Sequence, residues 1–357
     1  MKSLKLFVIG LIFFNFSGVY SQTNPPSIYE QMNAIIVAAG SGDINLGLQD
    51  VNTYLEGYVN PMAKGLGYGF ANGWYNTAEN HKPWGFDLTI NMSLAVVPDT
   101  DLSFNPGTLN QNTVLTPTDG NLPTIFSSST TKPTFENTNT ASVFEGLEGK
   151  DPSALTKSLT GLNYNTVPLP TVQVGIGLIK ETDIKIRYAP PVVLSDPTFG
   201  DLRVNLYGLG VMHNISQYLG SSEGRPFELS AFAGITRFNL SAKGQVPLDQ
   251  LGPKEFLIHV NSITLQAIIS KKIKILTLYG AAGINNTSLG FNLNGKFNLD
   301  FDPATAEVTD PVDLNFLATG ARLTGGFRVK LAIVSLHADY TLQKYPTLTA
   351  GFGITIR

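Results

Sequence analysis

The stretch Trp84-Gly-Phe-Asp-Leu-Thr-Ile-Asn-Met-Ser-Leu-Ala-Val-Val97 decides the fold of this chain. Apolar side chains occupy every second position from Trp84 onward, and small or polar residues from Gly85 to Ala95 alternate with them. Successive side chains of a strand point to opposite faces, so this segment predicts a strand with one apolar and one polar face. It exceeds the usual five or six residues of a soluble strand and can cross a bilayer, which needs ~9–11 tilted residues.

The same alternation recurs along the rest of the chain. It is visible in 172–178, 184–188, 202–206, 228–236, 256–270, 273–282, 289–301, 314–330, 332–343 and 348–356. Short connections near 76–83, 180–183, 270–272 and 330–331 are interleaved with long ones near 98–168, 190–200, 239–255 and 283–313. Short turns on one side and long loops on the other are typical of outer-membrane barrels. We predict an all-β fold, a transmembrane antiparallel β-barrel of about 12 strands, with 10–14 compatible with the pattern.

A barrel is the physical expectation because lipid leaves no partner for an unpaired backbone group, and a closed sheet has no open edge. The alternative is a soluble β-sandwich, in which a second sheet covers the apolar faces. Strand length, the loop asymmetry and a strand at the end of the chain favour the barrel. Arg357 stands where many such barrels end on an aromatic residue.

The N-terminus has the features of a secretory signal peptide. Lys2 and Lys5 precede an apolar run from Leu6 to Phe16, and the residues up to Ser21 fit a signal-peptidase site, so we expect cleavage after Ser21. The run is shorter than the ~20 apolar residues of a spanning helix. The chain contains no cysteine, which excludes disulfides, thiolate metal sites and a lipoprotein anchor. We therefore expect export to the outer membrane.

Two short helices are predicted after the signal peptide. Ser27 and Glu30 have capping-box spacing at the start of a helix over 28–39. A second helix is predicted over 46–58, where Leu48, Val51 and Leu55 recur at helical spacing and Asn60-Pro61 ends it. The chain then divides into a signal peptide at 1–21, a helical plug or periplasmic segment at 22–64, and a β-barrel at 65–357 with a long loop at 98–168.

The composition narrows the class of protein. Charged residues make up 14% of the chain, against roughly 25% in an average soluble protein. The net charge of −3 and the pI of about 5.8 give no reason to expect a nucleic-acid partner. The expected partners are outer-membrane lipid, small hydrophobic solutes, and the barrel-assembly machinery during biogenesis, and no cofactor is expected.

Several blocks carry a resemblance to a known family. They are Tyr58-Val-Asn-Pro-Met-Ala-Lys-Gly-Leu-Gly67, Asn72-Gly-Trp-Tyr-Asn-Thr77, Gly85-Phe-Asp-Leu-Thr89, Gly210-Val-Met-His-Asn-Ile-Ser-Gln-Tyr218, Leu336-His-Ala-Asp-Tyr-Thr341 and Gly351-Phe-Gly-Ile-Thr-Ile-Arg357. From about residue 44 to the C-terminus, except 98–168, the chain resembles an uncharacterised family of exported outer-membrane-type β-barrels. This implies a barrel of undefined activity and no catalytic residues. Helices followed by Asn60-Pro61 and a barrel more weakly resemble the long-chain fatty-acid transporters, whose N-terminal hatch plugs the lumen.

The polar faces of the predicted strands supply candidate lumen residues. These are Asp87, Lys185, Arg187, Arg203, Glu228, His337 and Asp339. They would line a selective pore or form a paired network that fills a narrow barrel, and the pattern does not separate these two possibilities. Leu48, Val51, Leu55, Asn60 and Pro61 are the candidate plug residues.

No enzyme or metal site is predicted. The four histidines are scattered without metal-ligand spacing. Ser335, His337 and Asp339 share one face of a strand, but neighbours at i and i+2 lie ~6.6–7 Å apart, too far for hydrogen bonds. We expect this row to be lumen polarity.

The function expected from the sequence is a porin or transporter-like channel for small or hydrophobic solutes, gated by helices within 28–64. Two alternatives remain. One is a structural or surface-exposed barrel, or a soluble exported β-sandwich that binds a partner without transport. The other is a barrel lipid hydrolase that uses Ser335 and His337.

Overall fold

The structure is a computed structural model that describes residues 44–110, 115–117, 120–127, 135–137, 163–196, 200–219, 226–244, 254–301 and 304–356. The predicted signal peptide at 1–21 and the first predicted helix at 28–39 lie outside the described residues. No helix in the described ranges combines the length and apolar character needed to cross a membrane.

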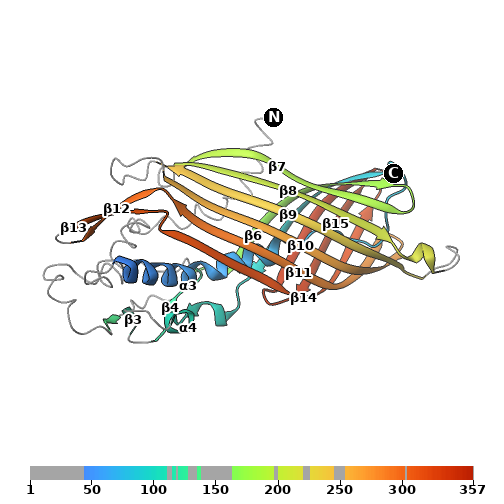
Figure 1. Ribbon diagram of the computed structural model, residues 1–357. Coiled ribbons are helices and arrows are strands. Elements are labelled where there is room, and N and C mark those ends of the chain that lie inside the picture. The colour runs from blue at the N-terminus through green and yellow to red at the C-terminus, as the bar shows by residue number, and fades with distance from the viewer. Residues whose placement is uncertain are drawn as a thin grey trace.

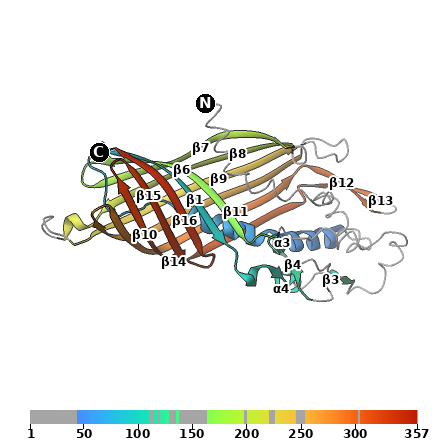
Figure 2. The same cartoon turned by 180° about the vertical axis from the view of Figure 1, so that it is seen from behind.

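The main body is a closed antiparallel barrel of ten strands (Figures 1 and 2). Around the ring these are β1 (Phe86–Val96), β16 (Thr347–Ile356), β15 (Val334–Leu342), β14 (Val312–Leu331), β11 (Leu276–Asn294), β10 (Lys254–Ile273), β9 (Glu228–Gly244), β8 (Gly200–Asn214), β7 (Thr182–Asp196) and β6 (Thr166–Leu178). The barrel is confirmed, but its strand number is ten rather than about 12. One reason is that residues 276–282 and 289–294, which belong to two separate predicted strands, form a single strand, β11. A second is that β12 (Lys296–Phe301) and β13 (Ala304–Thr309), beyond the end of β11, pair only with each other.

The ring is much taller on one side than on the other. Strands β10 and β14 have 20 residues each and β11 has 19, whereas β15 has nine and β16 has ten. Residues 190–196 and 239–244, which were predicted to lie in long connections, are therefore strand. Pro190 and Pro191 interrupt the β7–β8 register between Ala189 and Val192, because proline has no N–H to donate to the ladder.

The two ends of the barrel differ, as the sequence predicted. At the turn end, β6–β7, β10–β11 and β14–β15 are joined by two or three residues each. At the loop end lie the β12–β13 hairpin and the segment between β1 and β6. Within that segment the structure describes short elements: a 3₁₀ turn (Asp99–Asp101), β2 (Ser103–Phe104), α4 (Pro106–Leu109), β3 (Leu115–Pro117), β4 (Leu122–Pro123) and β5 (Phe135–Asn137). A further 3₁₀ turn (Ser216–Tyr218) lies at the turn end.

An apolar belt surrounds the turn-end half of the barrel. Its members include outward-facing side chains at least 40% exposed: Leu88, Ile186, Tyr188, Leu209, Ile235, Ile263, Leu265, Ile269, Leu278, Ile284, Leu323, Phe327, Leu336, Tyr340, Leu342, Leu348, Phe352 and Ile356. Monomeric soluble proteins rarely expose so large a continuous apolar surface. The belt, with the closed ring of backbone hydrogen bonds, defines an outer-membrane-type β-barrel.

Helix α3 (Ile44–Phe70) lies at the loop end, where it packs against the inner face of the barrel wall, chiefly against β14 (Figure 1). The prediction that a helix ends at Asn60-Pro61 was wrong, because α3 continues through Pro61 to Phe70. Proline removes one intrahelical hydrogen bond. Packing offsets this loss: Val51 is fully buried, Leu55 and Pro61 are buried, and Leu48 packs against the same apolar core.

Three glycines of α3 let the helix lie directly against the barrel wall. Gly65, Gly67 and Gly69 fall within the predicted β-barrel, which was expected to begin at residue 65, but they are helical. A Cβ at Gly69 would collide with Leu169, and one at Gly67 would lie 2.7 Å from the Cβ of Ala318. The barrel domain therefore does not begin at residue 65, because residues 65–70 belong to α3 and the first barrel strand begins at Phe86.

A loop-end cluster fastens the β1–β6 segment to α3. Asp101 accepts a hydrogen bond from the Tyr345 hydroxyl (2.6 Å) and lies 3.4 Å from the Lys64 ammonium. The Tyr345 ring stacks on Tyr68 at 5.5 Å. Burial alone would raise the pKa of Asp101, but the hydrogen bond from Tyr345 and the charge of Lys64 outweigh it and hold the pKa below 3.8. The cluster is therefore an ionised contact at neutral pH.

The stabilising effect of Asp101 should depend on pH. A carboxylate whose folded pKa is lowered stabilises the fold above its unfolded pKa, and that contribution is lost as pH falls through the folded pKa. We expect Asp101→Asn to lower the thermal midpoint at pH 7, and the gap from wild type to shrink as pH falls below 3.8. Circular dichroism melts from pH 7 to pH 2 measure this. A gap that stays constant over the range would contradict the ionised contact.

Candidate functional site: the plugged lumen and its mouth

The lumen of the barrel is filled by an N-terminal part of the same polypeptide chain. From Phe70 the backbone leaves α3 and runs down the interior as a lumen segment, residues 71–85, to the turn end, where β1 begins at Phe86. We call α3 and the lumen segment together the plug. Trp74, Tyr75 and Ala78 are buried in an apolar cluster with Phe232 and Tyr279 of the wall, among others. The plug therefore runs from the loop end to the turn end.

Two buried arginines hold the top of the lumen segment. Arg187 of β7 donates to the carbonyl of Phe70 (2.9 Å) and to that of Asn72 (2.5 Å). Its guanidinium also lies 3.6 Å from the centre of the Trp74 ring. From the opposite wall, Arg322 of β14 donates to the carbonyl of Ala71 (2.9 Å) and to the Asn72 side chain. Both side chains are nearly inaccessible to solvent.

Below the arginines, wall side chains bond to the lumen segment one residue after another. Asn91 and Gln173 donate to the carbonyls of Gly73 and Trp74, at 2.8 and 3.0 Å. The hydroxyl of Ser230 donates to the carbonyl of Ala78 (2.7 Å). The remaining contacts are Tyr75 to Gln266 (2.5 Å), the Ala78 amide to Ser270 (3.0 Å), Asn80 to the Met212 carbonyl (2.9 Å) and the His81 amide to Asp183 (3.0 Å). An irregular backbone inside the barrel is stable because these wall side chains satisfy its polar groups.

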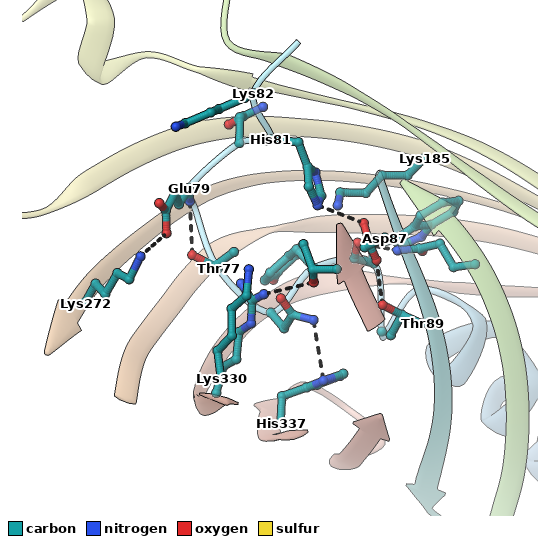
Figure 3. A pocket seen from close by; sticks show the side chains of 18 residues that line it. Thr77, Glu79, His81, Lys82, Asp87, Thr89, Lys185, Lys272, Lys330 and His337 are labelled. Atoms are coloured by element: carbon teal, nitrogen blue, oxygen red, sulfur yellow. Dashed lines mark hydrogen bonds and ion pairs between the residues drawn. The ribbon is translucent and has the colours of Figure 1, made fainter. Parts of the chain in front are cut away.

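A cavity of about 220 Å³ opens at the turn end (Figure 3). Its lining comes from the lower part of the lumen segment and from strands on both sides of the ring. The charged side chains that line it are Glu79, Lys82, Asp87, Lys185, Lys272, Arg328 and Lys330, and His81 and His337 lie among them. We call it the mouth cavity. It is the aqueous approach to the plug from the turn end.

The structure places six of the seven predicted lumen residues on the inward face. Asp87, Lys185 and Arg187 are buried there, as are His337 and Asp339. Glu228 is half-buried and accepts a hydrogen bond from Asn214 at 2.8 Å. Among them Asp87, Lys185 and His337 meet in the mouth cavity.

Arg203 is the exception, because it lies exposed on the outward face of β8. Its neighbours Val204 and Leu206 point inward instead, and Leu206 belongs to the core that packs on α3. The prediction took the apolar face as the lipid face. At the loop end the interior is apolar because a helix fills it, so the pattern there is reversed.

Ser335, His337 and Asp339 all point inward but have separate partners. Ser335 donates to the Gly353 carbonyl (3.4 Å), His337 lies 3.4 Å from the Asn76 amide, and Asp339 accepts from the Tyr279 hydroxyl (2.8 Å). No hydrogen bond links the three side chains to one another. Among the described residues, no group of three His, Asp or Glu side chains has the geometry of a metal site.

The sequence analysis missed the wall arginines of β14 and the lysines beside them. Arg322, Arg328 and Lys330 occupy even-numbered positions of one strand, the parity of the inward-facing Leu314 and Phe316. This shared parity could have identified the three side chains as inward-facing from the sequence. Lys272 was assigned to a turn, but it is the last inward position of β10 before the turn and lines the mouth cavity.

Comparison with known families identifies a relationship over nearly the whole chain. The model of a family of unknown function, DUF6588, matches residues 1–356. The chain belongs to this family. The resemblance to an uncharacterised family is thereby confirmed, and family membership assigns no activity. No curated protein matches the chain.

Three solved structures show the range of similar barrels. The translocator domain of the autotransporter NalP from Neisseria meningitidis is 10% identical, with a TM-score of 0.32, over 78% of this chain and 90% of that one. Ail from Yersinia pestis is 14% identical, with a TM-score of 0.25, over 49% and 96%. The P. putida toluene transporter TodX is 8% identical, with a TM-score of 0.25, over 77% and 68%. At these values the likeness assigns no function.

Proposed function

We propose that the protein is an outer-membrane channel for small solutes that its own N-terminal plug holds closed. The apolar belt supports insertion in lipid, and the short turns support a periplasmic turn end. Outer-membrane lipid is then the permanent partner of the belt. The polar mouth cavity favours polar over hydrophobic solutes.

The observation that carries the proposal is the chemistry of the wall behind the lumen segment. Apart from the apolar cluster around Trp74, its inward face is rich in hydroxyl and amide side chains: Thr89, Asn91, Ser93, Thr171, Gln173, Ser230, Ser262, Thr264, Gln266, Ser270, Thr287, Thr324, Thr341, Thr349 and Thr355. Without the plug these groups would be solvated by water, as in a porin lumen. Seven of these groups bond to the plug when it is present: Asn91, Gln173, Ser230, Gln266, Ser270, Thr287 and Thr341. Water could take the place of the plug at these positions.

A permanently plugged surface barrel is the second candidate, and the density of plug–wall hydrogen bonds favours it. The two candidates differ in whether the lumen is a conducting path once the plug is out. No catalytic role is proposed for Ser335 or His337.

Removing residues 44–81 should convert a closed barrel into an open one. All ten barrel strands lie after this segment, so the ring of backbone hydrogen bonds is retained. We expect the wild-type protein to give little conductance in planar bilayers and the deletion variant to give large, stable steps.

The fold of the deletion variant is checked by its heat-dependent gel shift in detergent. A variant that shows this shift and β-type circular dichroism, yet conducts no better than wild type, would refute the channel and favour the permanently plugged barrel.

A further inference from the structure

The mouth cavity has an excess of positive charge. Lys82, Lys185, Lys272, Arg328 and Lys330 line it, against the two carboxylates of Glu79 and Asp87. This is the reverse of the chain as a whole, whose net charge is −3. Cations concentrated in a cavity with low-dielectric walls attract and hold anions.

Part of this charge is already paired within the cavity. Lys272 lies 3.5 Å from Glu79, and Lys185 lies 3.9 Å from Asp183 behind the lining. Asp87 lies 3.3 Å from the His81 ring and accepts from Thr89 at 2.6 Å. Both lining carboxylates therefore have partners, and neither of them is paired with Arg328 or Lys330.

Arg328 is the buried and incompletely bonded member of the set. Its side chain is 8% exposed, and one terminal nitrogen donates to Thr355 at 3.3 Å. Its Nε is buried without a hydrogen-bond partner in the structure. Within the described residues no carboxylate lies within ion-pair distance of Arg328 or Lys330. A mostly buried guanidinium without a counter-ion is costly, so an anion in the cavity beside Arg328 would be bound favourably.

The geometry suits an oxyanion with several acceptor oxygens. Arg328 and Lys330 lie two residues apart on the same face of β14, ~6.6–7 Å along the strand. Lys272 reaches the same space from β10, two strands away around the ring. A guanidinium fork with ammonium groups beside it is the donor set that binds phosphate.

We propose that the mouth cavity is a binding site for a phosphate group, held chiefly by Arg328 and Lys330. The phosphate is carried by a soluble ester or by a phospholipid headgroup. Binding does not require the plug to move, so this proposal stands apart from the channel proposal.

The test is the binding of inorganic phosphate to the full-length protein in nanodiscs of phosphatidylcholine, measured by isothermal titration calorimetry. We expect saturable binding that weakens as salt rises. Arg328→Gln or Lys330→Gln should weaken it about tenfold or more, the loss expected for one charge-assisted contact. Arg328→Lys should have a smaller effect, because it keeps the charge but loses the fork.

Lys271→Gln is the matched control, because it removes one lysine charge from an exposed position of β10 that does not line the mouth cavity. Its phosphate affinity should equal that of wild type. Each variant is checked for the heat-dependent gel shift. Absence of saturable binding by the folded wild-type protein, or equal affinity in wild type and Arg328→Gln, would overturn the proposal.

A second lipid composition identifies the source of the phosphate group. If a headgroup is the ligand, nanodiscs containing phosphatidylglycerol should lower the apparent phosphate affinity of wild type but leave Lys330→Gln little changed. If a soluble ester is the ligand, wild type should bind phosphate equally in both lipids, and glycerol phosphate should compete.

Discussion

A double variant, Arg187→Met with Arg322→Met, is expected to conduct ions where the wild-type barrel is closed, and to unfold at a lower temperature. Both arginines hold the backbone at residues 70–72, where α3 passes into the lumen segment. Methionine fills similar volume but donates nothing, so buried carbonyls lose their partners. Hydrogen bonds to a charged donor are worth roughly 1.5–3 kcal/mol each, and a desolvated cation–π contact about 2.

The expected loss of unfolding free energy therefore exceeds roughly 3 kcal/mol for Arg187 alone. Two measurements check it: the temperature at which the heat-dependent gel shift occurs, and single-channel recording. The matched control is Arg203→Met with Arg237→Met, because both of these arginines are exposed on the outward face. If the double variant is as stable and as closed as this control, the arginines do not hold the plug.

In the conducting double variant, a disulfide between the plug and β1 is expected to abolish the conductance. The Cβ position at Gly69 lies 3.6 Å from the Cβ of Ala95, within the 3.5–4.5 Å of a disulfide. Leu169 occupies the same space and is shortened to alanine to make room. The chain has no cysteine of its own, so Gly69→Cys with Ala95→Cys forms the only possible bridge.

The two cysteines and the Leu169→Ala substitution are introduced into the Arg187→Met and Arg322→Met variant, where conductance is expected. The oxidised protein should be silent, and a reducing agent should restore the current. The variant with Gly69→Cys and Leu169→Ala but without the second cysteine should conduct under both conditions. An oxidised, bridged protein that still conducts would show that ions pass without displacement of α3.

The strands could be predicted because their side-chain period is a local property. Alternation from Trp84 to Val97 assigned Asp87 to the inward face, and the same reasoning assigned Lys185 and Arg187 to it; all three side chains are buried. The reasoning failed at Arg203, because it assumed that the apolar face always meets lipid. Whether an apolar face meets lipid or an internal helix depends on a partner remote in sequence.

The plug could be predicted only in part. Leu48, Val51 and Leu55 indicated an apolar helix, but the continuation through Pro61 depends on packing against the wall, which propensity does not encode. The lumen segment shows no helix-like or strand-like periodicity of apolar residues, since its conformation is set by the wall side chains that bond to it. The mouth cavity likewise joins residues from the plug and from strands on both sides of the ring.

The threading of the chain through its own ring has a consequence for assembly. The pairing that closes the ring joins Phe86 to Ile356, the first strand to the last, and it is the most non-local pairing of the barrel. Contacts of such sequence separation form slowly, because the entropy of closing the long loop is lost before the contact is gained. The residues that enter the lumen are synthesised before any strand that surrounds them. The simplest order of events is therefore that β14, β11 and β10 gather on α3 first, and that β16 meets β1 around a nucleus already in place.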